Sequence, residues 1–234
     1  MVNFIQNHDQ IANTGYGLRV HRLTSPGRYR AVTALMLLAP GTPMLFQGQE
    51  FAASSPFLYF ADHRAELANT IATGRAEFIA QFPSAATPEA QARLPDPRAQ
   101  VTFESCKLDF EERRTHAEVY ALHRDLLALR RGDPVFRRQT PRALDGAVLA
   151  PEAFVLRFFS EDGADRLLLV NLGRDLHLAP APEPLLAPPA GCTWRTLWSS
   201  EDPRYGGNGT PPLETQSGWR IPGHAAIALV PDQA

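Results

Sequence analysis

The sequence has 234 residues, 44% of them hydrophobic and 21% charged, a composition typical of folded globular proteins and not of disordered chains. Its 23 basic and 25 acidic residues nearly cancel, which argues against a nucleic-acid-binding protein. Lys107 is the only lysine, and the arginines are dispersed along the chain, which favours a coding bias over a functional basic patch.

The sequence gives no sign of a membrane segment, a disulfide scaffold or a metal site. Cys106 and Cys192 are far apart, and no metal-ligand spacing is present. The longest apolar run, residues 31–40, is far shorter than the roughly 20 residues that span a bilayer. Because the first residues also lack the basic start of a signal peptide, we expect a cytoplasmic protein without membrane contact, metal or cofactor.

The N-terminal part alternates short apolar runs with one helical segment. Residues 2–6 and 43–46 are each typical of a short buried strand, followed by polar turns at residues 7–10 and 47–50. Between them, a serine followed by a proline begins a mostly apolar helix over residues 26–39. This strand–helix–strand order predicts a parallel α/β sheet, in which ligands bind at the carboxyl ends of the strands.

A long excursion, residues 51–114, precedes the next strong helix signal. It contains a predicted helix around residues 64–81 and a proline-punctuated stretch over residues 83–97. A connection of this length is more often functional or locally folded than idle. Residues 115–118 then have a capping-box sequence that predicts the start of an amphipathic helix, which Gly132 and a following proline end.

The last part of the chain has the pattern of an antiparallel β domain. Helical periodicity is absent after about residue 141, and turn residues separate short apolar runs. The predicted strands are residues 154–159, 166–171, 193–198 and 225–230. We therefore expect an α/β part over residues 1–138, with a long insertion at 51–114, and an antiparallel β-sandwich over residues 139–234.

Polar side chains follow both predicted N-terminal strands. Asn7, His8 and Asp9 offer an amide, an imidazole and a carboxylate to one ligand, with Gln10 next to them, and Glu50 follows the second strand. Sugars are recognised by such clusters because each hydroxyl group both donates and accepts hydrogen bonds. A carboxylate there could also stabilise the oxocarbenium-like charge of glycosidic cleavage. The alternative is that these residues merely turn the chain.

Other candidate sites carry weaker signals. The aromatic residues at 57–60 could stack on sugar rings or belong to the core, and the three tryptophans could form a carbohydrate platform or be buried. Residues 206–209 lack the lysine of a phosphate-binding loop and are interpreted as a turn. His116 and His123, on the amphipathic helix, are predicted to lie at the surface.

At these positions the sequence resembles a known family. Residues 4–10, Phe-Ile-Gln-Asn-His-Asp-Gln, and residues 43–51, Pro-Met-Leu-Phe-Gln-Gly-Gln-Glu-Phe, are similar to the strand-seven and strand-eight segments of the α-amylase superfamily, glycoside hydrolase family 13. Further segments resemble the malto-oligosyltrehalose trehalohydrolase branch of that family: residues 55–63, 74–75, 77–78 and 199–207. Their order along the chain is the expected one, which is far more specific than Asn-His-Asp alone.

The resemblance implies the last two βα units of a (β/α)₈ barrel and a retaining glycosidase. This enzyme would hydrolyse the α-1,4 bond next to the terminal trehalose of malto-oligosyltrehalose. Asp9 matches the carboxylate that grips hydroxyls of the ring being cleaved and stabilises the transition state, and His8 matches a histidine that binds the same sugar. Asn7, Gln10 and Glu50 match neighbouring positions, where we expect them to bind a malto-oligosaccharide or malto-oligosyltrehalose substrate.

The family's nucleophilic aspartate and general-acid glutamate precede the Asn-His-Asp segment, and no matching motif occurs in these 234 residues. We therefore expect a C-terminal portion that needs the N-terminal part of the same enzyme and is inactive alone. The helix over residues 26–39 would then have uncovered apolar faces.

Two alternatives remain open. The Gly-Gln-Glu-Phe segment at residues 48–51 also suggests the tail of a glycogen branching enzyme. The self-contained pattern of residues 140–234 suggests instead a stand-alone carbohydrate-binding or structural β module.

Overall fold

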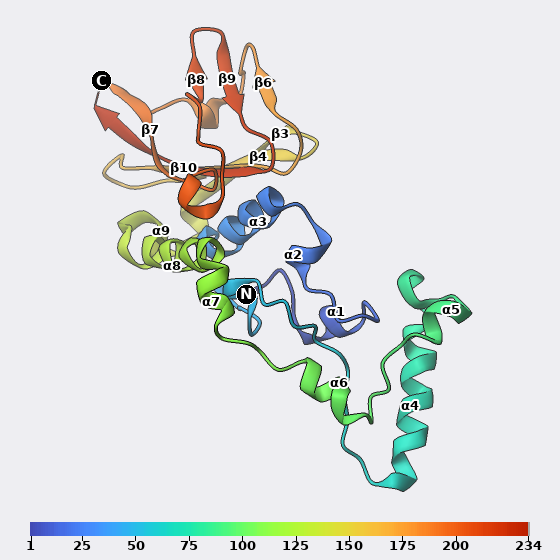
Figure 1. The fold of residues 1–234 in the computed structure, drawn as a ribbon. Coiled ribbons are helices and arrows are strands. Elements are labelled where there is room, and N and C mark those ends of the chain that lie inside the picture. Colours follow the sequence, from blue (N-terminus) through green and yellow to red (C-terminus); the bar gives the residue numbers. More distant parts are fainter. Residues whose placement is uncertain (234) are drawn as a thin grey trace. The chain divides into compact units, whose positions relative to one another are not determined.

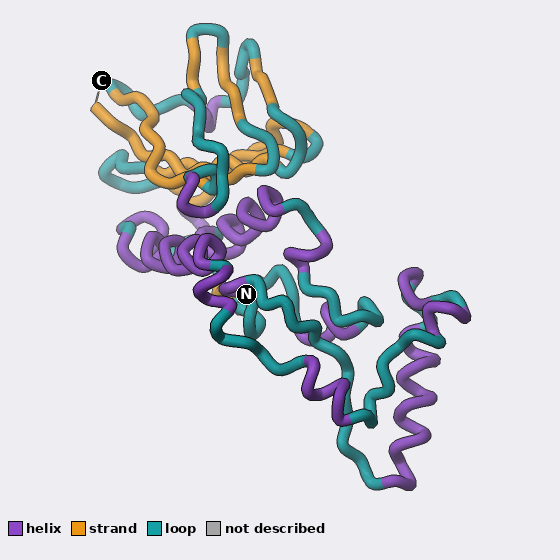
Figure 2. The backbone as a smooth tube through the Cα atoms, in the orientation of Figure 1, coloured by secondary structure: helices purple, strands orange, loops and turns teal. Residues whose placement is uncertain are grey.

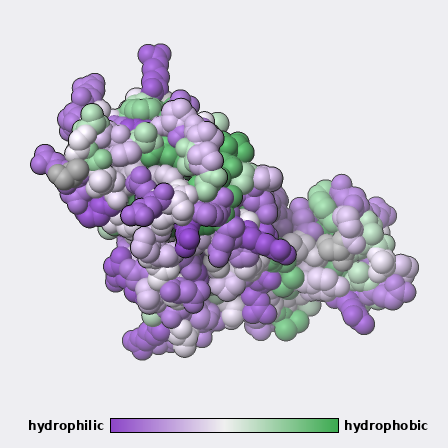
Figure 3. All heavy atoms as spheres, turned by 90° about the horizontal axis from the view of Figure 1, so that it is seen from above, coloured by the Kyte–Doolittle hydropathy of each residue, from purple (hydrophilic) through white to green (hydrophobic). Residues whose placement is uncertain are grey.

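The computed structural model describes residues 1–233, which divide into two compact units that interleave in the sequence (Figures 1 and 2). Unit 1 comprises Met1–Ile5, Thr24–Met44 and the residues from Glu118 onward, and unit 2 comprises Gln6–Leu23 and Leu45–Ala117. The boundary predicted between residues 138 and 139 stays a prediction. On the face shown in Figure 3, hydrophilic and hydrophobic residues are interspersed. No helix among the described residues is long and apolar enough to cross a membrane.

Unit 1 contains two antiparallel sheets. The larger has the order β3-β4-β5-β10-β7, with strands Leu144–Ala150, Ala153–Phe158, Arg166–Asn171, Ala225–Gln233 and Cys192–Ser199. The smaller has the order β6-β9-β8, with strands Leu176–Leu178, Gly218–Ile221 and Glu214–Thr215. All four strands predicted in this part are confirmed, as β4, β5, β7 and β10. The other four were not predicted, because three of them have only two to four residues and β3 is mostly half-buried or exposed.

The two sheets share one apolar core. Leu167 and Leu169 of β5 and Ile227 of β10 pack in the same cluster as Trp219 and Ile221 of the smaller sheet. Every residue of β5 is buried, so this central strand is covered on both faces. A strand in that position carries a continuous apolar run, which explains why its sequence does not alternate. Two of the three tryptophans, Trp198 and Trp219, are buried.

Helix α3, Pro26–Leu38, covers the other face of the larger sheet. It begins as predicted, because the Ser25 hydroxyl accepts a hydrogen bond from the Arg28 amide at 3.2 Å and proline occupies the first helical position. The helix contacts β5 and β10 (Figure 1), and Ala31 and Ala34 are completely buried. Small residues allow the helix to approach the sheet closely. The expectation of uncovered apolar faces is therefore wrong.

Helix α8, Ala117–Gly132, carries the predicted apolar stripe, and Leu122 and Leu126 are completely buried. Two details differ from the sequence prediction. Thr115 is the last residue of helix α7, Glu112–Thr115, and therefore does not cap α8. His123 is only 1% exposed, because it lies one turn from both Val119 and Leu126, on the buried face of the helix.

The remaining elements of unit 1 are short. Strands β1 and β2, Val2–Asn3 and Thr42–Pro43, pair in parallel, as the strand–helix–strand order predicts, although each has only two residues. The proline after α8 begins a further helix, α9, Pro134–Arg138, whose cap is Asp133. The 3₁₀ helices are η3, η4 and η5: Pro141–Ala143, Pro184–Leu186 and Pro203–Tyr205.

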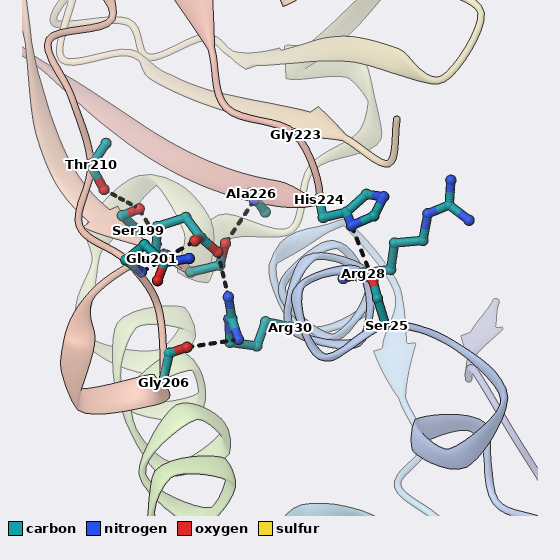
Figure 4. A network of polar contacts seen from close by, with 12 residues as sticks. Ser25, Arg28, Arg30, Ser199, Glu201, Gly206, Thr210, Gly223, His224 and Ala226 are labelled. Carbon is teal, nitrogen blue, oxygen red and sulfur yellow. Dashed lines mark hydrogen bonds and ion pairs between the residues drawn. The ribbon is translucent and has the colours of Figure 1, made fainter. Parts of the chain in front are cut away.

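A buried ion pair joins α3 to the loop after β7 (Figure 4). Arg30 Nη2 lies 2.6 Å from Glu201 Oε1, and both side chains are 9% exposed. Arg30 also donates through Nη1 to the carbonyl of Gly206, so one guanidinium contacts both ends of the loop. The segment at 199–207, which resembles a motif of the family, therefore holds the helix against the β strands.

Unit 2 consists mainly of loops and short helices (Figure 2). The predicted helix around residues 64–81 is confirmed as α4, Ala65–Ile79, the longest helix of this unit among the described residues. Its other elements are α1, α2, η1, η2, α5 and α6: His8–Ala12, Val20–Leu23, Gln49–Phe51, Pro83–Ala85, Pro88–Gln91 and Gln100–Ser105; α7 also belongs to it.

We predict that Glu201→Ala lowers the free energy of unfolding by about 3–5 kcal/mol, because it leaves the Arg30 charge buried without its partner. The control is Glu152→Ala, which breaks the pair between Glu152 and Arg28 of the same helix. That pair is 57% and 40% exposed, so its loss should cost no more than about 1 kcal/mol. Urea unfolding measures both values, and equal losses for the two variants would contradict the role of the buried pair.

The second stability prediction concerns pH. Burial lowers the pKa of His123 from 6.5 to about 4, against a smaller opposing effect of its hydrogen bond with the Val119 carbonyl. Between these pH values the unfolded chain binds the proton more tightly than the folded one. The free energy of unfolding therefore falls as pH falls from 6.5 to 4, by at most about 1.4 kcal/mol per pH unit from this group.

His123→Leu should flatten this dependence, measured as urea unfolding at pH 7, 6 and 5. The matched control is His177→Leu, which removes an exposed histidine of β6 and should leave the slope in place. An unchanged slope in His123→Leu would refute the assignment.

Candidate functional site

The Asn-His-Asp-Gln segment begins a helix and does not simply turn the chain. Asn7 is the N-cap of α1: its Oδ1 accepts a hydrogen bond from the Gln10 amide at 2.9 Å. In return, Gln10 Oε1 accepts a hydrogen bond from the Asn7 amide at 3.1 Å. The two side chains thus form a capping box, which satisfies two amides at the start of the helix. Asn7 and Gln10 fix the backbone on which the next two side chains are presented.

His8 and Asp9 are the first two residues of α1, and both project into solvent. Their side chains are 66% and 72% exposed, and His8 Nε2 lies 3.4 Å from Asp9 Oδ1. A carboxylate in the first turn of a helix is favoured by the unpaired amides there. The arrangement presents an imidazole and a carboxylate side by side, a donor and an acceptor pair suited to the hydroxyl groups of a sugar.

Glu50 lies on a second tight segment, the 3₁₀ helix η1. The preceding Gly48 has a φ of +79°, and a Cβ atom there would lie 2.7 Å from the Cβ of Ala53, so only glycine fits. Glu50 Oε1 is 4.0 Å from Arg113 Nη2, and the Glu50 side chain is 29% exposed. Arg113 also lies over the ring of Phe51, 5.5 Å from its centroid.

One buried arginine fixes the segment that carries Glu50. Arg19 is 1% exposed; its Nη1 donates to the carbonyl of Gln47 and its Nε to that of Ser55, each at 2.7 Å. These carbonyls lie on either side of η1, so a single guanidinium holds both ends of the loop. The Arg19 guanidinium also lies 5.7 Å from the ring centroid of Phe46.

A second arginine fixes the end of α1. Arg75 of α4 donates through Nη1 to Asn13 Oδ1 at 2.8 Å and through Nη2 to the carbonyl of Ala12 at 3.1 Å. Its guanidinium lies 4.8 Å from the ring centroid of Tyr59. Burial lowers the pKa of Arg75, while the negative charge of Asp9 acts in the opposite direction. Arg75 therefore links α4 to the end of α1 through two hydrogen bonds.

Titratable groups gather near the same loop. Burial, then the charges of Arg19, Arg22 and His116, lower the pKa of His21 to about 4. Burial by itself would raise the pKa of Glu112, but hydrogen bonds from the hydroxyl and amide of Ser54 bring it below its usual value. At neutral pH the cluster therefore holds a neutral His21 and an ionised Glu112.

The predicted site residues fall into two groups, residues 7–10 and Glu50, that do not contact each other through polar groups. No hydrogen bond or ion pair among the described residues joins Glu50 to Asn7, His8, Asp9 or Gln10. Among the same residues, no cluster of three or more His, Cys, Asp or Glu side chains could hold a metal ion. Sequence reasoning did not select Arg19 or the cluster at Glu112. An arginine in an irregular loop has no periodic signal that would predict its burial.

The aromatic run at 57–60 divides between interior and surface. Leu58 is buried, Phe57 is half-buried, and Tyr59 and Phe60 are 39% and 36% exposed, so the aromatic rings of the run are not fully buried in the core. Their stacking on sugar rings stays a prediction. Gly206 has a φ of +75° and lies just after η5, in agreement with the turn predicted for residues 206–209.

Comparison with known proteins finds one matching family and several curated relatives, each over only part of the chain. Residues 141–227 match a family described as a domain of unknown function, DUF3459. The chain is 46% identical over 78 residues to malto-oligosyltrehalose trehalohydrolase of Deinococcus radiodurans, which covers 33% of this chain and 13% of the relative. It is 41% identical over 99 residues to the enzyme of the same name from Arthrobacter ramosus, covering 42% of this chain and 16% of the relative. The aligned regions thus span less than a fifth of these relatives.

Solved structures match nearly the whole chain. A Salmonella typhimurium protein described as an alpha amylase superimposes with a TM-score of 0.72 at 27% identity, over 99% of this chain and 35% of that one. Trehalose-6-phosphate hydrolase of Bacillus licheniformis superimposes with a TM-score of 0.57 at 17% identity, over 99% of this chain and 43% of that one, and supports the fold alone.

The relatives and the solved structures agree with the family resemblance that the sequence motifs indicated. The chain is therefore similar to the malto-oligosyltrehalose trehalohydrolases over a small part of their length, and over nearly its whole own length to a solved structure described as an alpha amylase.

Proposed function

We propose that the chain is part of a retaining glycosidase that hydrolyses the α-1,4 bond next to the terminal trehalose of malto-oligosyltrehalose. The observation that carries this proposal is the capped start of α1, which presents His8 and Asp9 together to solvent in a chain similar to enzymes of that name. In this proposal β1, α3 and β2 belong to the last two βα units of a (β/α)₈ barrel, and their parallel pairing supports it.

In this mechanism Asp9 acts on charge that develops during cleavage. Its carboxylate accepts hydrogen bonds from hydroxyl groups of the sugar in the cleavage subsite and stabilises the oxocarbenium-like transition state. His8 donates a hydrogen bond to the same ring. Asn7 and Gln10 hold the backbone in place through the capping box, and Glu50 binds a neighbouring part of the glucan, with Arg113 nearby.

Retaining hydrolysis needs a nucleophilic carboxylate and a carboxylic acid about 5–5.5 Å apart. Asp9 does not supply either role in the proposed mechanism, and Glu50 is not joined to it by a hydrogen bond or ion pair. We therefore propose that both groups come from a region of the enzyme that precedes these residues in the family. Residues 1–234 alone should have no activity.

Two observations weigh against the alternatives. The curated relatives reported above are named trehalohydrolases, which favours trehalose release over the branch transfer of a glycogen branching enzyme. Helices α3 and α8 belong to the same compact unit as the β strands. An integral part of an enzyme fits this grouping better than a stand-alone β module does.

The role of Asp9 can be tested in a chimera in which this chain replaces the corresponding C-terminal region of the Deinococcus radiodurans relative. We expect Asp9→Asn to lower kcat for trehalose release from maltotriosyltrehalose by about 100-fold or more, because an amide cannot stabilise the positive charge of the transition state. The control is Asp232→Asn, at an exposed aspartate of β10, which should leave kcat unchanged. An Asp9→Asn chimera with normal kcat would refute the proposed role.

A second assay tests the dependence on the rest of the enzyme. Purified residues 1–234 should release no trehalose from maltotriosyltrehalose, because the nucleophile and the acid are lacking. Release of trehalose at a rate that Asp9→Asn abolishes would contradict this prediction.

A further inference from the structure

The excursion between residues 51 and 114 contains a pocket to which the proposed mechanism gives no role. Its volume is about 650 Å³, within the range of small-molecule sites. It is formed by the chain around Phe60 and by helix α6 with the residues just before it. All of its lining residues belong to unit 2.

Aromatic rings connect this pocket to the loop that carries Glu50. Phe46 packs edge-on against Phe57 at 5.0 Å between centroids, Phe57 against Phe60 at 6.1 Å, and Phe60 against Phe103 at 5.1 Å. The row begins on the segment held by Arg19 and ends at the pocket, where Lys107 Nζ lies 5.0 Å from the ring centroid of Phe103. Despite these contacts, Phe103 is 45% exposed. An exposed ring held in a fixed orientation offers an apolar surface on which a flat ligand can stack.

Polar groups around the rings are also held in place. Arg98 donates to both carboxylate oxygens of Asp96, through Nε at 2.9 Å and Nη2 at 2.8 Å, and also to Asn69. Gln100 Nε2 donates to Glu104 Oε1 at 2.6 Å. Because these side chains already have hydrogen-bond partners, a ligand that binds them would lose less side-chain entropy than it would with unpaired side chains.

The charges in the pocket indicate a neutral ligand. Two basic side chains, Arg98 and Lys107, are balanced by two acidic ones, Asp62 and Glu104. Because neither sign of charge predominates among these lining side chains, the pocket does not favour an anion or a cation over a neutral ligand. A polyol both donates and accepts hydrogen bonds, and the apolar face of a pyranose ring can stack on an aromatic side chain.

We propose that this pocket binds a segment of a neutral oligosaccharide, with Phe60 and Phe103 as the stacking surface and Asp62, Arg98 and Lys107 as hydrogen-bonding groups. That the oligosaccharide is an α-1,4-glucan rests on the function proposed above. The excursion then has a function of its own, because it binds glucan at Phe60 and Phe103. Phe57 and Phe46 connect these two rings to the loop of Glu50.

The test is titration of the full chain with maltotriose, followed by ligand-observed NMR. We expect wild-type protein to bind maltotriose and Phe103→Ala to bind it about tenfold more weakly or worse, as expected for an aromatic contact at the centre of a site. The matched control is Phe159→Ala in unit 1. Phe159 is 41% exposed and has Arg157 5.3 Å from its ring centroid, so it has similar exposure and a similar cation contact.

Thermal unfolding measures whether Phe103→Ala is folded. If it is not, a second variant of the pocket provides the test. Asp62→Ala changes an exposed side chain and should also weaken binding, while Asp232→Asn, at an exposed aspartate of unit 1, should not. Loss of maltotriose binding in Asp9→Asn but not in Phe103→Ala or Asp62→Ala would overturn this proposal and leave the proposed function standing. Absence of binding to the wild-type chain, or displacement of maltotriose by inorganic phosphate, would overturn it as well.

Discussion

Backbone carbonyl groups outside helices and sheet ladders need hydrogen-bond donors when they are buried, and in this chain arginine supplies them repeatedly. In unit 1, Arg130 donates to the carbonyls of Leu37, Ala39 and Gly41, at the end of α3. In unit 2, Arg19 does the same on either side of η1. A guanidinium presents five donors in a rigid fork, so one side chain can fix two or three carbonyls, which lysine does less well.

This constraint determines how the candidate site is held. The capping box sets the first turn of α1, but Arg75 fixes the end of that helix and Arg19 fixes the loop of Glu50. The backbone that carries the exposed His8 and Asp9 therefore depends on Arg75, at the other end of α1. The arginines are dispersed along the sequence, which was interpreted as a coding bias. Individual arginines nevertheless make specific structural hydrogen bonds.

The sequence was informative where local chemistry decides the structure and uninformative where distant contacts do. The serine–proline start of α3 and the apolar run of β5 were both predicted, because each depends on neighbouring residues. The capping box of Asn7 and Gln10 has a recognisable spacing and could have been predicted as well. The burial of His123 follows from its place on the stripe of α8, whereas the burial of Arg19 depends on carbonyls 28 and 36 residues away. The roles of the site residues came from the family resemblance and remain proposals.

The central claim is that a buried guanidinium holds the loop that presents Glu50, and hydrogen exchange of Arg19→Lys tests it most directly. Lysine keeps the charge but cannot donate to both carbonyls in the same geometry. In Arg19→Lys we expect the amides of residues 46–55 to exchange about tenfold faster or more than in the wild-type chain. Exchange of the amides of β5 and β10 should not change. The control variant Arg22→Lys, at an exposed arginine, should leave exchange over residues 46–55 unchanged. Unchanged exchange over residues 46–55 in folded Arg19→Lys would contradict the account.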